Sequence, residues 1–100
     1  EYNGSYTAGF KNLFDWASVH TLKMFEGKQM ILLSTAPGER GGQSALNAAV
    51  NRFPKHGGEI IGTMILPSYK KNFDPQIGFK NDKTQGDFES FLKQVLSRLN

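Results

Sequence analysis

Hydrophobic residues recur at helical spacing in three parts of the chain. Within each part they fall three and four positions apart, which places them on one face of a helix. The three helices are predicted over residues 6–18, over residues 43–53 and from residue 84 onward. Their apolar stripes are Phe10, Leu13, Phe14 and Ala17, then Leu46, Ala49, Val50 and Phe53, then Phe88, Phe91, Leu92, Val95 and Leu99.

Local signals define the ends of these helices. Ser5 or Thr7 is expected to cap the first helix, because a hydroxyl there can accept a bond from a free backbone amide. Thr84-Gln85-Gly86-Asp87 has a capping-box pattern at the start of the third. His56-Gly57-Gly58 is expected to end the second helix.

Two apolar runs predict β-strands, over residues 28–34 and over residues 59–66. The first contains Met30-Ile31-Leu32-Leu33, and the second contains Ile60-Ile61 and Met64-Ile65-Leu66. Unbroken apolarity in the first run indicates burial on both faces, which is typical of parallel strands covered by helices. The order helix, strand, helix, strand, helix therefore predicts an α/β fold with a parallel sheet and right-handed crossovers.

Two loops follow the predicted strands. Residues 35–42, Thr-Ala-Pro-Gly-Glu-Arg-Gly-Gly, form a Gly-rich connection into the second helix. Residues 67–83 are expected to form a long polar loop with three aromatic residues, and loops of this length are often functional or mobile.

Two parallel strands are too few for three amphipathic helices, because they cannot cover those helices and also protect their own edges. We therefore expect further strands before residue 1, so that residues 1–100 are the C-terminal portion of one domain. For the isolated chain we expect oligomerisation, or pairing with another chain, to cover the open edge of the first strand.

Composition narrows the classes of function. The chain has 100 residues, no cysteine and a net charge of +3, so disulfides and thiolate chemistry are excluded. The basic residues are spread along the chain, which argues against a nucleic-acid partner. No apolar run approaches the roughly 20 residues that span a bilayer. With no signal-peptide pattern at the start, we expect a cytoplasmic protein that does not bind membranes.

Two separated motifs resemble those of the NADPH-dependent FMN reductases. Glu1-Tyr2-Asn3-Gly4-Ser5, followed by Phe10-Lys11-Asn12-Leu13-Phe14-Asp15-Trp16, is similar to that family's Pro-Glu-Tyr-Asn loop and Leu-Lys-Asn-x-x-Asp-Trp helix, with Phe10 in place of the leucine. Gly27-Lys28 before a buried strand and the Gly-rich loop after it resemble a second family block. Leu66-Pro67 with Asn72-Phe73-Asp74 is a weaker, third match.

The resemblance implies a flavodoxin-like doubly wound parallel sheet with strand order 2-1-3-4-5. The two strands present would be strands 4 and 5 of that sheet, and strands 1–3 would be missing. The family's flavin-phosphate loop follows strand 1, so these 100 residues would not supply it. For this reason we expect little or no flavin binding, and no activity, from the chain alone.

The implied activity is an oxidoreductase reaction with FMN as cofactor and NADPH or NADH as co-substrate. Hydride would pass from the nicotinamide to FMN, and then to a small-molecule acceptor such as a quinone, azo compound, metal ion or free flavin. Members of the family are commonly homo-oligomers, and Phe10, Phe14 and Trp16 are expected to lie in the core or a subunit contact. The main alternative is a flavodoxin-like FMN-binding electron carrier that does not oxidise NADPH directly. An independent α/β interaction module is a third.

The predicted cofactor-binding residues lie in two segments. They are Glu1, Tyr2, Asn3, Gly4 and Ser5, and then Thr35, Ala36, Pro37, Gly38 and Arg40. Such loops suit the polar edge of an isoalloxazine ring, because glycine lets backbone groups approach closely. Arg40 could stabilise negative charge on reduced flavin or attract NADPH phosphates. No catalytic side chain and no metal ligand is expected, and both histidines, His20 and His56, are interpreted as surface residues.

Overall fold

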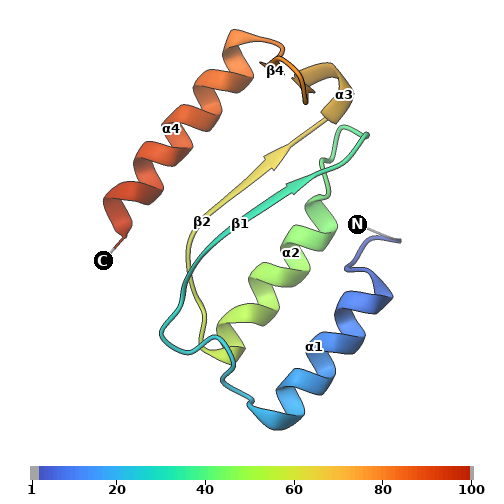
Figure 1. Ribbon diagram of the computed structural model, residues 1–100, viewed down its shortest axis with the longest axis vertical. Helices are drawn as coiled ribbons and strands as arrows, with labels where there is room; N and C mark the ends of the chain where they lie inside the picture. Colours follow the sequence, from blue (N-terminus) through green and yellow to red (C-terminus); the bar gives the residue numbers. More distant parts are fainter. Residues whose placement is uncertain (1–2, 100) are drawn as a thin grey trace.

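Two parallel strands lie at the centre of the structure, a computed structural model that describes residues 3–99 (Figure 1). β1 (Gln29–Thr35) runs beside β2 (Glu59–Leu66), in register from Gln29↔Glu59 to Thr35↔Leu66 with one shift between Met30 and Ile31. Because the strands are parallel, their carboxyl ends meet at one edge of the sheet. Both strands predicted from the apolar runs are therefore confirmed.

Helices cover the two strands from opposite sides (Figure 1). α1 (Ala8–His20) and α2 (Gln43–Arg52), which continues into the 3₁₀ helix η1 (Phe53–His56), lie on one side, and α4 (Asp82–Arg98) lies on the other. This arrangement is consistent with part of a flavodoxin-like fold. No helix within residues 3–99 is both long and apolar enough to cross a membrane.

The main core lies between β1 and the helix pair. Phe14, Ala49 and Phe53 are buried there, and Met30 and Leu32 of β1 pack against them. The rings of Phe14 and Phe53 have centroids 5.8 Å apart, a distance typical of favourable aromatic pairs. The predicted stripes of the first two helices thus contribute to one shared core.

A smaller contact joins β2 to α4. Val95 is almost fully buried. A side chain at Gly62 would lie 2.3 Å from Val95 Cγ1, so the helix approaches the strand because that position is glycine. Val95 belongs to the predicted stripe of the third helix, whose burial is confirmed at this residue.

The other face of β1 departs from the prediction of burial on both sides. Ile31 is 41% exposed and Leu33 is 58% exposed, whereas Leu32 between them is half-buried. Among residues 3–99 the only strand paired with β1 is β2. Within the part of the chain that the structure describes, the face of β1 that carries Ile31 and Leu33 is therefore only partly covered.

The helix starts also differ from the predicted ones. α1 begins at Ala8, and Thr7 caps it by accepting a 3.0 Å bond from the amide of Phe10. α4 begins at Asp82, because Asn81 caps it by accepting a 2.8 Å bond from the amide of Thr84. The capping box predicted from residue 84 was wrong, since the residue types Asn and Asp are equally good caps three positions earlier.

The prediction of one continuous loop over residues 67–83 was wrong. The segment contains the short helix α3 (Tyr69–Asn72) and an antiparallel pair, β3 (Phe73–Asp74) and β4 (Gly78–Phe79). Aromatic rings hold it together and against α4, with centroid distances of 5.3 Å for both Phe73–Phe79 and Phe79–Phe88. Strands of two residues are too short to produce a periodic pattern in the sequence.

His56 is a core residue, which corrects its interpretation as a surface histidine. Its side chain is 1% exposed, with Nδ1 2.6 Å from the carbonyl oxygen of Leu22 and Nε2 accepting a 3.1 Å bond from Nε of Arg52. A carbonyl can only accept and a guanidinium can only donate, so these partners select the tautomer with its proton on Nδ1. His20, at the end of α1, is exposed as predicted.

Tyr6 makes the stability of the fold depend on pH in the alkaline range. Burial raises the pKa of its hydroxyl, and the positive charges of Lys11 and Arg52 offset part of that rise. The stability from neutral Tyr6 is therefore complete below the unfolded-state pKa of about 10 and is lost as pH rises through the higher folded-state value. We expect Tyr6→Phe to lose less stability than the wild type between about pH 9 and pH 11, measured by urea denaturation. Equal losses in the two proteins would contradict this assignment.

Candidate functional site

Two side chains fix the carboxyl ends of the strands. The hydroxyl of Thr35, at the end of β1, donates a 2.8 Å bond to the carbonyl oxygen of Leu66, at the end of β2. The hydroxyl of Ser34 donates a 2.8 Å bond to the carbonyl oxygen of Gly41. Hydrogen bonds therefore attach both ends of the Gly-rich loop to the sheet.

Gly41 and Gly42 are the positions where the loop requires glycine. Both are buried and left-handed, with φ of 59° and 80°, a region that other residues enter at a cost. A side chain on Gly41 would lie 3.1 Å from the carbonyl oxygen of Leu66 and from backbone atoms of Pro67. Neither glycine was among the predicted cofactor-binding residues, although the Gly-Gly pair itself was a visible signal.

The segment after β2 holds the same loop from the other side. The amide of Ser68 donates a 2.9 Å bond to the carbonyl oxygen of Gly38, and the amide of Tyr69 donates a 3.1 Å bond to that of Ala36. The amides of Gly38, Glu39 and Arg40 make no backbone hydrogen bond to any of residues 3–99. The loop thus directs carbonyls towards residues 68 and 69 and leaves a run of exposed amides at its tip.

The N-terminal motif meets this loop at the first turn of α2. Asn3 and Gly4 form a left-handed turn with φ of 51° and 79°. A side chain on Gly4 would lie 3.9 Å from Cβ of Ser44, and Nη2 of Arg40 donates a 2.7 Å bond to the hydroxyl of that serine. Two segments separated in sequence therefore come together around Ser44.

The predicted site residues occupy different environments within this arrangement. Pro37, Gly38 and Arg40 are exposed, whereas Ala36 and Ser5 are half-buried. The hydroxyl of Thr35 is already engaged by the sheet. Glu1 and Tyr2 lie outside the residues that the structure describes.

An apolar cavity of about 350 Å³ reaches the same end of β1 from the α4 side. Four aromatic rings contribute to its lining, together with side chains of both strands. Those rings belong to Tyr69, Phe73, Phe79 and Phe88. Sequence reasoning did not find this cavity, because three of the rings come from the segment that was interpreted as a loop.

Parallel α/β proteins of this class bind their ligands outside the carboxyl ends of the strands, where the loops described above converge. The sequence profile of one such family, described as NADPH-dependent FMN reductase, matches residues 1–76, and the chain therefore belongs to that family. The match includes every element from α1 to β3 and ends before β4 and α4. No curated protein and no solved structure gives a significant match. Membership confirms the resemblance found in the sequence and implies an oxidoreductase that uses FMN and NADPH.

Proposed function

We propose that this chain is part of an FMN-dependent oxidoreductase that takes hydride from NADPH or NADH and reduces a small acceptor. Candidate acceptors are a quinone, an azo compound, a metal ion and free flavin. The observation that supports this function best is the convergence of Gly4 and Arg40 on Ser44, beside the exposed amides of residues 38–40. Titration of the full-length protein with FMN, followed by an assay of NADPH oxidation, tests the proposal.

The described residues fit the ring of FMN. Backbone amides at Gly38, Glu39 and Arg40 can donate to the oxygen and nitrogen acceptors on the polar edge of an isoalloxazine. The left-handed turn at Asn3 and Gly4 would form the facing wall of the site. Neither Gly4 nor Gly38 places a side chain between the backbone and the ligand. When bound, FMN supplies the hydride-accepting chemistry.

Arg40 is the charged residue best placed to act in this site. Its bond to Ser44 uses one guanidinium nitrogen and leaves further N–H groups in an exposed position. We expect Arg40→Ala, in the full-length protein loaded with FMN, to slow hydride transfer or raise the KM for NADPH about tenfold, because a charge-assisted hydrogen bond is lost. Stopped-flow reduction and steady-state kinetics measure the two effects. Ser44→Ala, which removes only the support of Arg40, should have a smaller effect, and unchanged kinetics in Arg40→Ala would refute the role.

We further propose that the protein assembles as a homo-oligomer through α1. Leu13, Trp16 and Val19 form an apolar stripe on this helix and are 71%, 64% and 75% exposed. Large exposed side chains that cluster are typical of subunit interfaces, and tryptophan is enriched among residues that dominate binding energy.

The oligomer can be tested without disturbing the core, because Trp16 is mostly exposed. Trp16→Ser should weaken self-association by at least about tenfold, as expected for an interface residue worth more than 1 kcal/mol. Analytical ultracentrifugation over a concentration series measures this change. Asn12→Ser, at another exposed position of α1, is the matched control and should leave the mass unchanged. A wild-type protein that stays monomeric, or a Trp16→Ser variant that associates equally well, would exclude this interface.

A further inference from the structure

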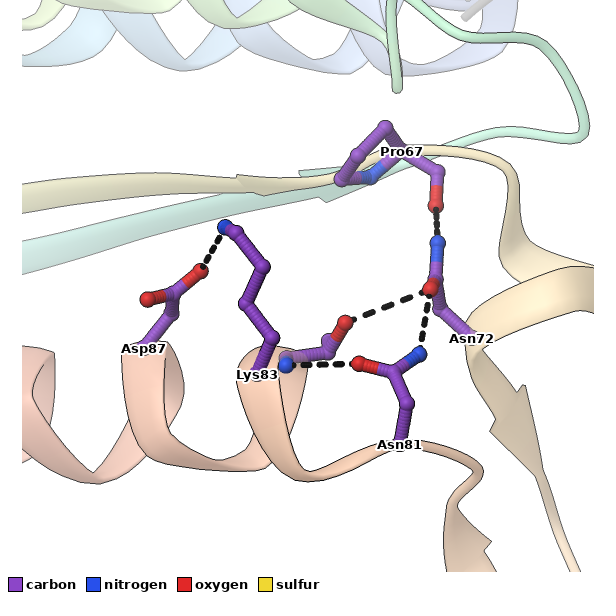
Figure 2. A network of polar contacts seen from close by, with 6 residues as sticks. Pro67, Asn72, Asn81, Lys83 and Asp87 are labelled. Carbon is purple, nitrogen blue, oxygen red and sulfur yellow. Dashed lines mark hydrogen bonds and ion pairs between the residues drawn. The ribbon is translucent and has the colours of Figure 1, made fainter.

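Asn72 connects three parts of the chain through its side-chain amide (Figure 2). Its Nδ2 donates to the carbonyl oxygens of Pro67 at 2.7 Å and Ser68 at 3.4 Å. Its Oδ1 accepts from Nδ2 of Asn81 at 2.8 Å and from the hydroxyl of Thr84 at 3.2 Å. The end of β2 is thereby linked to the first turn of α4.

The orientation of the Asn72 amide is determined by its neighbours. The backbone amide of Thr84 donates to Oδ1 of Asn81, so the NH₂ group of Asn81 must face Asn72. Only the oxygen of Asn72 can accept from that group, which directs its own NH₂ towards Pro67 and Ser68. An exchange of the amide oxygen and nitrogen would place two acceptors opposite each other.

The turn that Asn72 holds has an unusual backbone. Ser68 is left-handed, with φ of 47° and ψ of 62°, a conformation in which residues other than glycine are uncommon. Its carbonyl oxygen also accepts a 2.9 Å bond from the amide of Lys71, while its amide reaches Gly38. Strained residues persist where the surrounding bonds over-determine them, and they concentrate at functional sites.

We propose that Asn72 is a positioning residue for the flavin-binding loop, an inference that rests on the proposed function. Its NH₂ group holds Pro67 and Ser68 in the left-handed turn, and this turn presents the amides of Ser68 and Tyr69 to the carbonyls of Gly38 and Ala36. The side-chain hydrogen bonds of Asn72 go to residues 67, 68, 81 and 84 and not to the loop at residues 35–42. Asn72 therefore affects FMN binding through residues 67–69.

Asn72→Asp is the variant that separates the two sides of this network. A carboxylate can still accept from Asn81 and Thr84, but it cannot donate to Pro67 and Ser68 and repels their carbonyl oxygens. Thr84→Val is the matched control, because it removes one bond on the helix side and leaves the turn side intact. Two measurements are made on the full-length proteins: hydrogen exchange of the Ser68 and Tyr69 amides without ligand, and the Kd for FMN.

We expect faster exchange at Ser68 and Tyr69 in Asn72→Asp and an FMN Kd raised about tenfold, the effect of a lost, partly buried hydrogen bond. In Thr84→Val the exchange rates and the FMN Kd should both stay within about twofold of the wild type, because the bonds from Asn72 to Pro67 and Ser68 are untouched. A twofold change corresponds to less than about 0.5 kcal/mol, which is typical of such a substitution. Unchanged exchange in Asn72→Asp would overturn the proposal, and so would faster exchange with an unchanged Kd. A wild-type protein that does not bind FMN would refute the proposed function instead, and the exchange rates would then decide alone whether Asn72 positions the loop.

Discussion

Replacement of Gly41 by alanine should weaken FMN binding by the full-length protein at least about tenfold and destabilise the fold by about 1–3 kcal/mol. The added methyl group would lie 3.1 Å from three backbone atoms of Leu66, the last residue of β2, and Pro67, the residue after it. Gly41 is also left-handed, with φ of 59°, so alanine disfavours the observed backbone as well. The loop would move away from β2, and the amides at its tip would move with it.

Gly86→Ala is the matched control for this prediction. Gly86 lies inside α4, and a side chain there would meet nothing within 4 Å. The same added methyl group should therefore stabilise the protein, by about 0.5–1 kcal/mol, and leave FMN affinity unchanged. Equilibrium denaturation and fluorescence titration with FMN measure both effects. Equal FMN affinity in Gly41→Ala and in the wild type would show that the loop is not where the flavin binds.

Replacement of His56 by alanine should lower the free energy of unfolding by about 2–4 kcal/mol. The change removes a fully buried ring that packs edge-on against Phe14, with centroids 4.9 Å apart. It also deprives the carbonyl of Leu22 and the guanidinium of Arg52 of their partner. The free-energy cost of the cavity adds to the cost of the unpaired groups, because the site lies under α1 and cannot collapse freely.

The second histidine supplies the control for this change. His20→Ala, at the exposed end of α1, should change stability by no more than about 0.5 kcal/mol. His56→Gln should be intermediate, since its amide can still donate and accept. Urea denaturation monitored by circular dichroism compares the three variants, and equal effects of His20→Ala and His56→Ala would contradict the structural role of His56.

The sequence predicted the elements whose burial follows a clear period. The stripes of α1 and α2 appear at their expected places, because one-sided burial produces the helical spacing that was used to find them. The apolar runs of β1 and β2 also appear at their expected places, although the run in β1 was interpreted as burial on both faces and one of its faces is partly exposed. Phe14 is buried as expected, whereas Leu13 of the same predicted stripe is 71% exposed. The spacing alone could not distinguish the core side of α1 from its neighbouring surface.

The predictions that were wrong concern residues whose environment depends on contacts with distant parts of the chain. His56 is buried because the carbonyl of Leu22, 34 residues away, accepts a bond from its ring. α3, β3 and β4 are stabilised by aromatic packing against α4 and by the network around Asn72. Local patterns contain no information on such partners.

The candidate site was partly predictable. Family resemblance selected the two segments that the structure brings together around Ser44, and it selected Arg40 within the second. It did not select Gly41 and Gly42, whose importance depends on their close approach to β2 and Ser34. Nor did it assign a role in the site to Ser68, whose amide donates to the loop, or to Asn72, which appeared only in the third, weaker match.

The most direct test of the central claim is anaerobic mixing of the FMN-loaded, full-length protein with NADPH, followed by flavin absorbance. An FMN-dependent oxidoreductase whose loops hold the flavin at the carboxyl ends of β1 and β2 should lose its oxidised-flavin absorbance rapidly, without any added protein. Absorbance that remains until a partner reductase is added would contradict an NADPH-oxidising enzyme and would identify an electron carrier instead.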